Sequence, residues 1–180
     1  VCRETGNECV IATGDRDSLQ LVAPDVTVRL ATTKFGQPHA AVYDEEKVLE
    51  EYGVTPPQMI DIKAIQGDSS DNIPGVAGIG PKGAGELIRK YGSLDAVYQH
   101  VDDPEIKDGM RKKLKEGKDS AYLSQRLGTI CTEAPIDTNL SDYAIKIGDR
   151  AEAARLMAKL ELFSLMERFG LTTQTESESG

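Results

Sequence analysis

A glycine-rich run between two helical patterns narrows the possible folds of this chain more than any other feature. The run is Ile73-Pro74-Gly75-Val76-Ala77-Gly78-Ile79-Gly80-Pro81-Lys82. Three glycines in such a short stretch allow sharp turns and a close approach of the backbone to another molecule. Proline favours the first position of a helix. The run therefore predicts a tight hairpin between two helices, and a plain connector between core helices is the alternative.

This hairpin has the chemistry of a phosphate-binding site. Free backbone N–H groups at the start of the second helix, with Lys82 beside them, would bind a phosphate. Gly78, Gly80 and Lys82 are therefore candidates for contact with a nucleic-acid backbone in a helix-hairpin-helix, a motif that does not read sequence. No strand precedes the glycines, so the run does not match a dinucleotide-binding fingerprint.

The remaining patterns separate a strand-containing portion from a helical one. Short β-favouring runs predict strands at 9–12, 26–30 and 41–43, with a turn at 35–38, and a helix follows Asp44. The later patterns are helical, over 56–67, 81–91, 93–100, 104–116, 118–127 and 150–169, and a capping-box pattern at Thr55-Pro56-Pro57-Gln58 opens the first of them. In the last helix Leu156, Leu160, Phe163 and Met166 recur at helical spacing, which predicts a stripe facing the core.

These patterns predict an α/β fold in three parts. Residues 1–54 form an α/β portion with an acidic loop, and residues 55–171 form a mostly helical lobe that carries the hairpin. Residues 172–180 contain no apolar side chain, which favours a disordered tail or a linker. Val1 opens the chain in place of Met, and we expect an N-terminal part to precede it.

Two acidic loops are candidates for a metal site. Asp15 and Asp17 follow the first predicted strand, and Asp68 and Asp71 follow the helix that ends at Gly67. Either pair alone is as well explained by turns and helix caps. The second loop has no lysine or arginine, and carboxylates that approach one another repel unless a cation holds them. If the two loops meet, four carboxylates favour Mg²⁺ or Mn²⁺.

Basic residues gather in one part of an otherwise acidic chain. The net charge is −9, which argues against wrapping of nucleic acid through bulk positive charge. Residues 81–126 nevertheless hold 10 bases against 8 acids, a local net charge of +2. Arg111, Lys112 and Lys113 lie in this segment. A basic helix face is usually just solvated, but beside a phosphate-binding hairpin it becomes a candidate DNA contact.

Several other classes of protein find no support in the sequence. The 180 residues are enough for one domain or two small lobes. No apolar run is long enough to span a membrane, and no signal-peptide pattern opens the chain. Three cysteines without C-x-x-C spacing indicate neither a disulfide framework nor a zinc site, which favours the cytoplasm. His39 and His100 are interpreted as surface residues, and no catalytic triad is visible.

Taken in order, three motifs resemble those of one nuclease family. They are Thr13-Gly14-Asp15-Arg16-Asp17, Gln66-Gly67-Asp68-Ser69-Ser70-Asp71-Asn72-Ile73-Pro74-Gly75-Val76 and Gly78-Ile79-Gly80-Pro81-Lys82. The chain is similar to the 5′-nuclease (flap endonuclease) family from about Glu8 to Leu171, and most closely to the 5′→3′ exonuclease domain of bacterial DNA polymerase I. The resemblance implies the C-terminal part of a Rossmann-like (PIN-like) sheet followed by a helix-hairpin-helix lobe.

The resemblance also implies a function and a set of site residues. It implies a two-metal phosphodiesterase that acts on DNA carrying a 5′ flap, a nick or an RNA primer, in the cytoplasm (bacterial nucleoid). Asp15, Asp17, Asp68 and Asp71 match its second metal site, for Mg²⁺ or Mn²⁺. Gly78, Gly80 and Lys82 match the hairpin that holds duplex DNA. Main-chain carbonyls at Val76 and Ile79 would bind K⁺, although Gly75 stands where some members have a hydroxyl ligand.

The family's first metal site has no counterpart in these 180 residues, so the resemblance implies little or no activity for this chain alone. In the family, polymerase domains follow, and residues 172–180 would begin the linker to them. Two alternatives stay open. One is a free-standing 5′→3′ exonuclease, and the other is a non-catalytic helix-hairpin-helix DNA-binding module whose aspartates only cap and turn.

Overall fold

The computed structural model describes residues 1–34, 36–146 and 148–171. The chain forms two compact units, Val1–Pro135 and Ile136–Gly180, each of which is described by itself. Among the described residues, no helix is both long and apolar enough to cross a membrane. The predicted tail at 172–180 lies outside the described residues.

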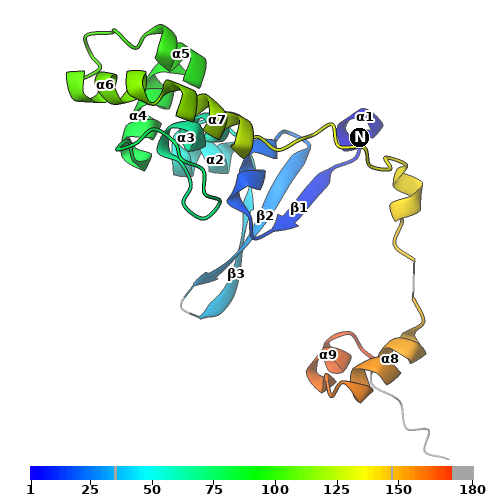
Figure 1. Ribbon diagram of the computed structural model, residues 1–180. Coiled ribbons are helices and arrows are strands. Elements are labelled where there is room, and N and C mark those ends of the chain that lie inside the picture. Colours follow the sequence, from blue (N-terminus) through cyan, green and yellow to red (C-terminus); the bar gives the residue numbers. More distant parts are fainter. Residues whose placement is uncertain (35, 147, 172–180) are drawn as a thin grey trace, which may run out of the picture. The chain divides into compact units, whose positions relative to one another are not determined.

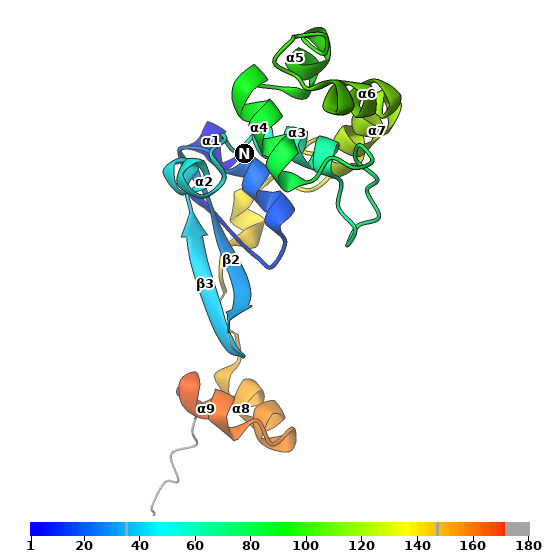
Figure 2. The same ribbon diagram turned by 90° about the vertical axis from the view of Figure 1, so that its left-hand side faces the viewer.

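A three-stranded mixed sheet forms one side of the first unit (Figures 1 and 2). β1 (Cys9–Thr13) pairs in parallel with β2 (Val26–Lys34), which pairs antiparallel with β3 (Gln37–Tyr43). All three predicted strands are present, and β2 and β3 are longer than predicted. Pro38, expected in a turn, pairs with Thr33 in the β2–β3 hairpin. β3 is an edge strand, where proline is tolerated because no ladder hydrogen bond is lost on the open side.

One face of the sheet is covered by apolar side chains from the segments around it. A short 3₁₀ helix, η1 (Arg16–Leu21), follows β1, and α2 (Glu45–Tyr52) follows β3. Asp44 caps α2 by accepting a hydrogen bond from the Lys47 N–H at 2.8 Å, as predicted. The buried cluster consists of Leu19, Val22, Val28, Leu30, Tyr43 and Val48. This packing places the loop after β1 against the helical part of the same unit.

The helical part of the first unit packs around one core. α3 (Gln58–Gln66) is central and contacts α4 (Pro81–Tyr91), α5 (Leu94–Gln99) and α7 (Lys118–Gly128), and α6 (Asp108–Glu116) precedes α7 (Figure 1). The Thr55 N–H donates to Gln58 Oε1 at 2.8 Å, which is half of the predicted capping box. The core includes Ile65, Ile88, Leu94, Val97 and Leu114.

One helix begins later than predicted. The sequence predicts a helix over 104–116, whereas α6 begins at Asp108. The guanidinium of Arg111 donates to the carbonyls of Val101, Asp103 and Ile106 at 2.8–3.2 Å. Because Arg111 donates hydrogen bonds to these carbonyls, the segment before α6 does not need helical hydrogen bonds and stays irregular.

The expected boundary near residue 54 does not separate compact units. Residues on both sides of it belong to Val1–Pro135. The Gln20 amide holds them together, because its Nε2 donates to Gly128 O and its Oε1 accepts from the Ile130 N–H, both at 3.0 Å. The sheet and the helices from α1 (Cys2–Thr5) to α7 therefore belong to one compact unit (Figure 1).

The second unit corrects one helix prediction. It contains η2 (Leu140–Tyr143), α8 (Arg150–Lys159) and α9 (Phe163–Arg168) in place of a single helix over 150–169. The break lies at Glu161, whose φ is 57°. Of the predicted core stripe only Met166 is buried, whereas Leu156, Leu160 and Phe163 are exposed. Turning the chain back lets Met166 and Leu171 pack with Ala154, which a straight helix would keep apart.

Candidate metal centre and nucleic-acid interface

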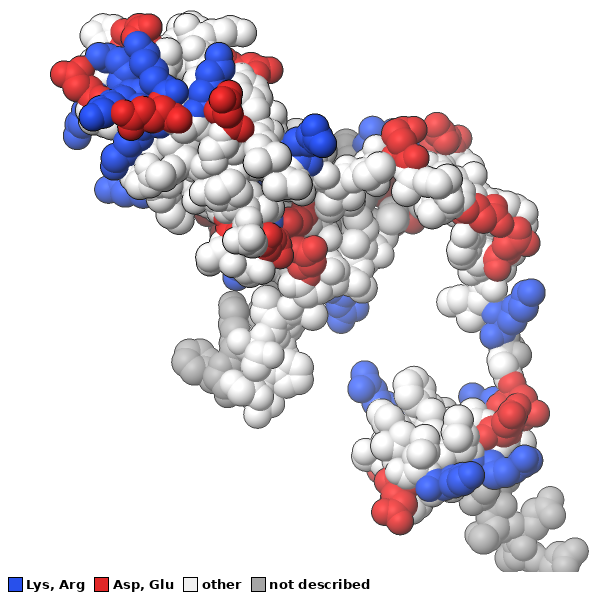
Figure 3. All heavy atoms as spheres, in the orientation of Figure 1, with Lys and Arg blue, Asp and Glu red and all other residues white. Residues whose placement is uncertain are grey.

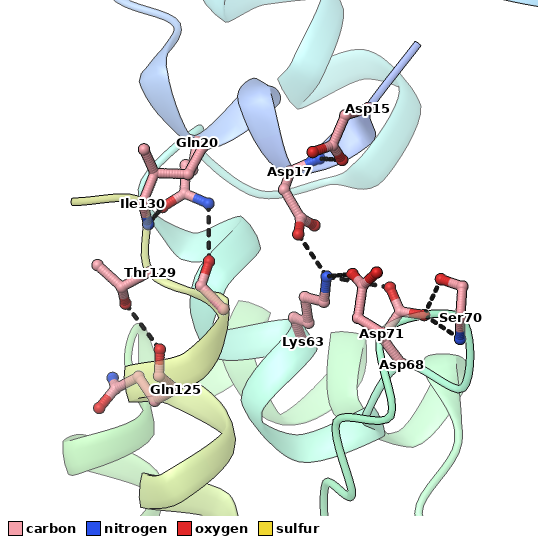
Figure 4. Close-up of polar contacts among 11 residues, drawn as sticks. Asp15, Asp17, Gln20, Lys63, Asp68, Ser70, Asp71, Gln125, Thr129 and Ile130 are labelled. Atoms are coloured by element: carbon pink, nitrogen blue, oxygen red, sulfur yellow. Dashed lines mark hydrogen bonds and ion pairs between the residues drawn. The ribbon is translucent and has the colours of Figure 1, made fainter. Parts of the chain in front are cut away.

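The two acidic loops meet in the first unit. Asp17 lies in η1, and Asp68 and Asp71 lie in the loop after α3. Each of the three offers one carboxylate oxygen, and these oxygens all lie within 4.8 Å of one another. Figure 4 shows the three side chains converging on one point from two segments of the chain. The sequence predicts a metal site only if the two acidic loops meet. In the structure they do meet, and three of the four aspartates come together.

Asp15 is not a member of this group. Its carboxylate caps η1 and accepts a hydrogen bond from the Asp17 N–H at 2.9 Å (Figure 4). For Asp15 the structure therefore shows the capping role that the sequence left open as the alternative. The cap fixes the backbone at Asp17, whose side chain reaches the cluster.

Lys63 lies at the centre of the cluster, and sequence reasoning missed it. Its Nζ is 2.5 Å from Asp17 Oδ2, 2.9 Å from Asp71 Oδ2 and 3.0 Å from Asp68 Oδ2. The residue is buried, with 7% of its surface exposed. The second acidic loop itself contains no base, and Lys63 comes from the preceding helix α3. Its position one turn before the end of that helix is the signal that could have found it.

Hydrogen bonds and charge shift the protonation of this cluster. Hydrogen bonds from Ser70 and then from Lys63 lower the pKa of Asp68 to about 2. Burial opposes the charge on Lys63, but its hydrogen bonds with Asp17, Asp71 and Asp68 outweigh burial and raise its pKa. At neutral pH the centre therefore holds the ionised carboxylate of Asp68 beside the ammonium group of Lys63.

The second acidic loop is fixed by backbone contacts that require glycine. Asp68 and Ile73 exchange two backbone hydrogen bonds of 2.8 Å. Gly67 has a φ of +75°, and a Cβ there would lie 2.7 Å from Ile73 O. Gly75 has a φ of +62°, and a Cβ there would lie 2.3 Å from the Gly67 nitrogen. The two glycines thus allow the close approach that holds Asp68 and Asp71 in place.

The predicted hairpin is present, and buried side chains and hydrogen bonds hold it against the rest of the unit. Val76 and Ile79 are buried. The Ser124 hydroxyl accepts from the Gly75 N–H at 2.9 Å, and the Val76 carbonyl accepts from the Ile79 N–H at 3.1 Å. Gly80 caps α4, whose first residue is a proline, as predicted. Gly80 and Lys82 are exposed at the start of that helix.

The three basic residues of α6 have different surroundings. Figure 3 shows blue side chains interleaved with red ones over this helix. Lys113 donates from Nζ to the Gly78 carbonyl at 2.9 Å, so it braces the tip of the hairpin. Lys112 is exposed and lies 3.8 Å from Glu116. Arg111 is committed to the loop carbonyls before α6, so the structure favours a structural role for it over a surface contact.

A cavity of about 470 Å³ connects the acidic cluster with the helical part. Asp17, Lys63 and Asp68 line it, and so do Pro81 and Gly85 at the start of α4. Arg16 and Arg89 add positive charge to its wall. The acidic cluster and the first turn of the helix after the hairpin therefore open into the same space.

Comparison with known proteins identifies the family. Residues 54–151 match the family described as 5′-3′ exonuclease, C-terminal SAM fold. The chain belongs to this 5′-3′ exonuclease family. The resemblance seen in the sequence motifs is thereby confirmed, and the α/β fold with a helical lobe agrees with it.

Curated relatives from several bacteria are described as DNA polymerase I. The chain is 43% identical over 176 residues to DNA polymerase I of Caldicellulosiruptor bescii, covering 98% of this chain and 20% of that protein. It is 38% identical over 165 residues to DNA polymerase I of Bacillus subtilis, covering 92% and 18%. The chain thus spans about a fifth of the length of the relatives it matches.

Solved structures of 5′ nucleases share the fold. A T5 5′-exonuclease described with bound divalent metal ions (zinc) is 25% identical, with a TM-score of 0.54, over 71% of this chain and 46% of that one. The catalytic core of Rad2 is 20% identical, with a TM-score of 0.54, over 82% of this chain and 53% of that one. The Rad2 likeness shows the fold alone.

Proposed function

We propose that this 5′-3′ exonuclease family chain supplies one metal site and the duplex-binding hairpin of a nuclease acting on DNA at 5′ flaps, nicks or RNA primers. The convergence of Asp17, Asp68 and Asp71 from two loops carries the proposal. The DNA polymerase I relatives support a polymerase as the covalent partner and the bacterial cytoplasm as the location. A free-standing exonuclease is the alternative within this class.

The carboxylate cluster fits a hard divalent cation. Three aspartate oxygens within 4.8 Å of one another form the oxygen-rich donor set that suits Mg²⁺ or Mn²⁺. Asp17, Asp68 and Asp71 would hold the ion, and Asp15 would join only if its carboxylate left the cap of η1. Such an ion supplies Lewis-acid stabilisation of the charge that develops on a phosphodiester oxygen.

The hairpin would bind the DNA backbone. Exposed Gly80 and Lys82 at the start of α4, and the turn at Gly78, offer backbone N–H groups and one ammonium for a phosphate. Lys112 and Lys113 extend this positive surface along α6. Carbonyls at Val76 and Ile79 remain candidates for K⁺, although the Val76 carbonyl already accepts one hydrogen bond.

Two-metal hydrolysis needs a second ion about 3.5–4 Å from the first. Because no residues in this chain match the family's first metal site, we expect a Mg²⁺-dependent flap-cleavage assay to give little or no turnover with the 180 residues alone. Turnover near that of an intact domain would contradict this expectation.

Calorimetric titration with Mn²⁺ tests the metal site directly. We expect Asp68→Asn and Asp71→Asn to abolish Mn²⁺ binding, because each removes a ligand charge. Asp102→Asn is the matched control, since Asp102 is an exposed aspartate paired with Lys115 away from the cluster. Equal Mn²⁺ binding by all four proteins would favour the non-catalytic DNA-binding module.

A further inference from the structure

The ammonium group of Lys63 has the position that a cation bound by all three carboxylates would take. Its Nζ lies within 3.0 Å of an oxygen of Asp17, Asp68 and Asp71 (Figure 4). Three carboxylates at this separation repel one another unless positive charge offsets them. In the structure, Lys63 is the residue that supplies this charge.

The Lys63 stem holds the ammonium in this position. Lys63 lies in α3, which packs against α7, and its Cδ lies 3.3 Å from where a Cβ on Gly128 would be. Because the aliphatic stem of Lys63 is buried, the side chain has little freedom to move. The ammonium group therefore stays in the cluster unless another cation replaces it. Removal of a buried ion's partner is strongly destabilising, because the remaining charges stay uncompensated.

A divalent ion and this ammonium would compete for the same oxygens. Both cations would lie within about 3 Å of the same three carboxylates, where their mutual repulsion is large. The cavity beside the cluster is also lined by Lys63 and leads to the start of α4. A displaced ammonium therefore has an adjoining space to enter, and an anionic phosphate in that space would be its natural partner.

We propose that Lys63 is an internal counter-cation that holds the three aspartates together without metal and leaves the cluster when a divalent ion enters. This inference rests on the proposed metal site and adds an exchange step to it. Lys63 is thus a positioning residue. Its exchange couples metal entry to the release of a positive charge into the cavity where substrate phosphate would lie.

Mn²⁺ calorimetry on Lys63→Met tests the exchange. Because the competitor is removed, Mn²⁺ should bind this variant more tightly than the wild type by at least about fivefold, the lower end of usual coupling between two ligands. Lys63→Arg, which keeps the charge, should stay close to the wild type, and Lys47→Met, which loses an exposed pair with Glu50, should not change Mn²⁺ affinity. Thermal melting gives a second readout, in which Mn²⁺ should raise the Tm of Lys63→Met more than that of the wild type.

An experiment on the wild type covers the case in which Lys63→Met does not fold. The side-chain ¹⁵N resonances of the lysines are followed during Mg²⁺ addition, and the Lys63 signal is assigned from its loss in Lys63→Arg. We expect the Lys63 resonance to shift and saturate in step with Mg²⁺ binding measured by calorimetry.

The outcomes separate the exchange from the metal site itself. Equal Mn²⁺ affinity in wild type and Lys63→Met, or Mg²⁺ binding that leaves the Lys63 resonance unmoved, overturns the exchange and leaves the metal site standing. Absence of Mn²⁺ binding in both proteins overturns the metal site and the exchange together. Binding by Lys63→Met alone supports the metal site and overturns the exchange, because Lys63 then does not leave the wild-type cluster.

Discussion

Replacing Gly75 with alanine should disrupt the acidic loop and the hairpin together. Gly75 has a φ of +62°, and its Cβ would lie 2.3 Å from the Gly67 nitrogen and 2.7 Å from the Gln66 carbonyl carbon. Both contacts are with backbone, so no side chain can swing away. The left-handed conformation costs about 1–2 kcal/mol for a residue with a Cβ. Forcing extra atoms into a packed region costs about 1–3 kcal/mol more.

The expected loss in the free energy of unfolding is therefore about 2–5 kcal/mol. For a unit of this size, 1 kcal/mol corresponds to a few degrees in Tm, so the Tm should fall by about 10 °C. Gly92→Ala is the matched control, because Gly92 has a φ of +90° with no atom within 4 Å of the added Cβ. It should lose only the cost of the backbone conformation.

Thermal melts of the two variants, together with Mn²⁺ titration, check this reasoning. We expect Gly75→Ala to lose both stability and Mn²⁺ binding, because the displaced backbone carries Asp68 and Asp71. Gly92→Ala should keep Mn²⁺ binding. If Gly75→Ala melts no lower than Gly92→Ala, the close approach of Gly75 and Gly67 does not hold the acidic loop in place.

Three other predictions concern charge. Lys82→Ala and Lys112→Ala should each weaken DNA binding and lower the salt slope by about 1, as measured by fluorescence anisotropy over a salt series, and an unchanged slope would exclude that residue as a phosphate contact. Arg111→Met should lower the Tm, because three loop carbonyls lose their donor, and should leave the salt slope unchanged; the reverse result would assign Arg111 to DNA. Because the folded-state pKa of Asp68 is about 2, below its ordinary value of 3.8, its stabilisation is complete above about pH 5 and is lost as the pH falls toward 2. Melts of metal-free protein between pH 5 and 2 should therefore show a smaller decline for Asp68→Asn than for the wild type.

Local signals in the sequence predicted most of the elements. Asp44 and the Thr55–Gln58 pair mark helix starts through contacts within four residues, and the structure contains these contacts. The glycine-rich hairpin was predicted for the same reason, since its turns depend on residues in the run itself. Elements defined by short-range chemistry can be predicted from one sequence.

Long-range contacts account for what the sequence did not predict. Lys63 contacts Asp17, which lies 46 positions away in the sequence. No spacing pattern in one sequence predicts a contact over that separation. The helix break at Glu161 was not predicted for a different reason. The helical spacing of apolar residues continues through this position in the sequence. There, packing of Met166 and Leu171 onto Ala154 outweighed local helix propensity.

The amide of Gln20 has a consequence for the order in which the first unit folds. It joins Gln20 to Gly128 and Ile130, contacts that span 108 and 110 positions in sequence. Closing so long a loop loses much chain entropy, so these bonds should form after the local helices and the β2–β3 hairpin. Their formation brings η1 onto the end of α7, next to the side of α3 that carries Lys63. We therefore expect the acidic centre to be completed in a late step of folding, so that a nascent chain acquires its metal affinity only after the segment beyond α7 has been synthesised.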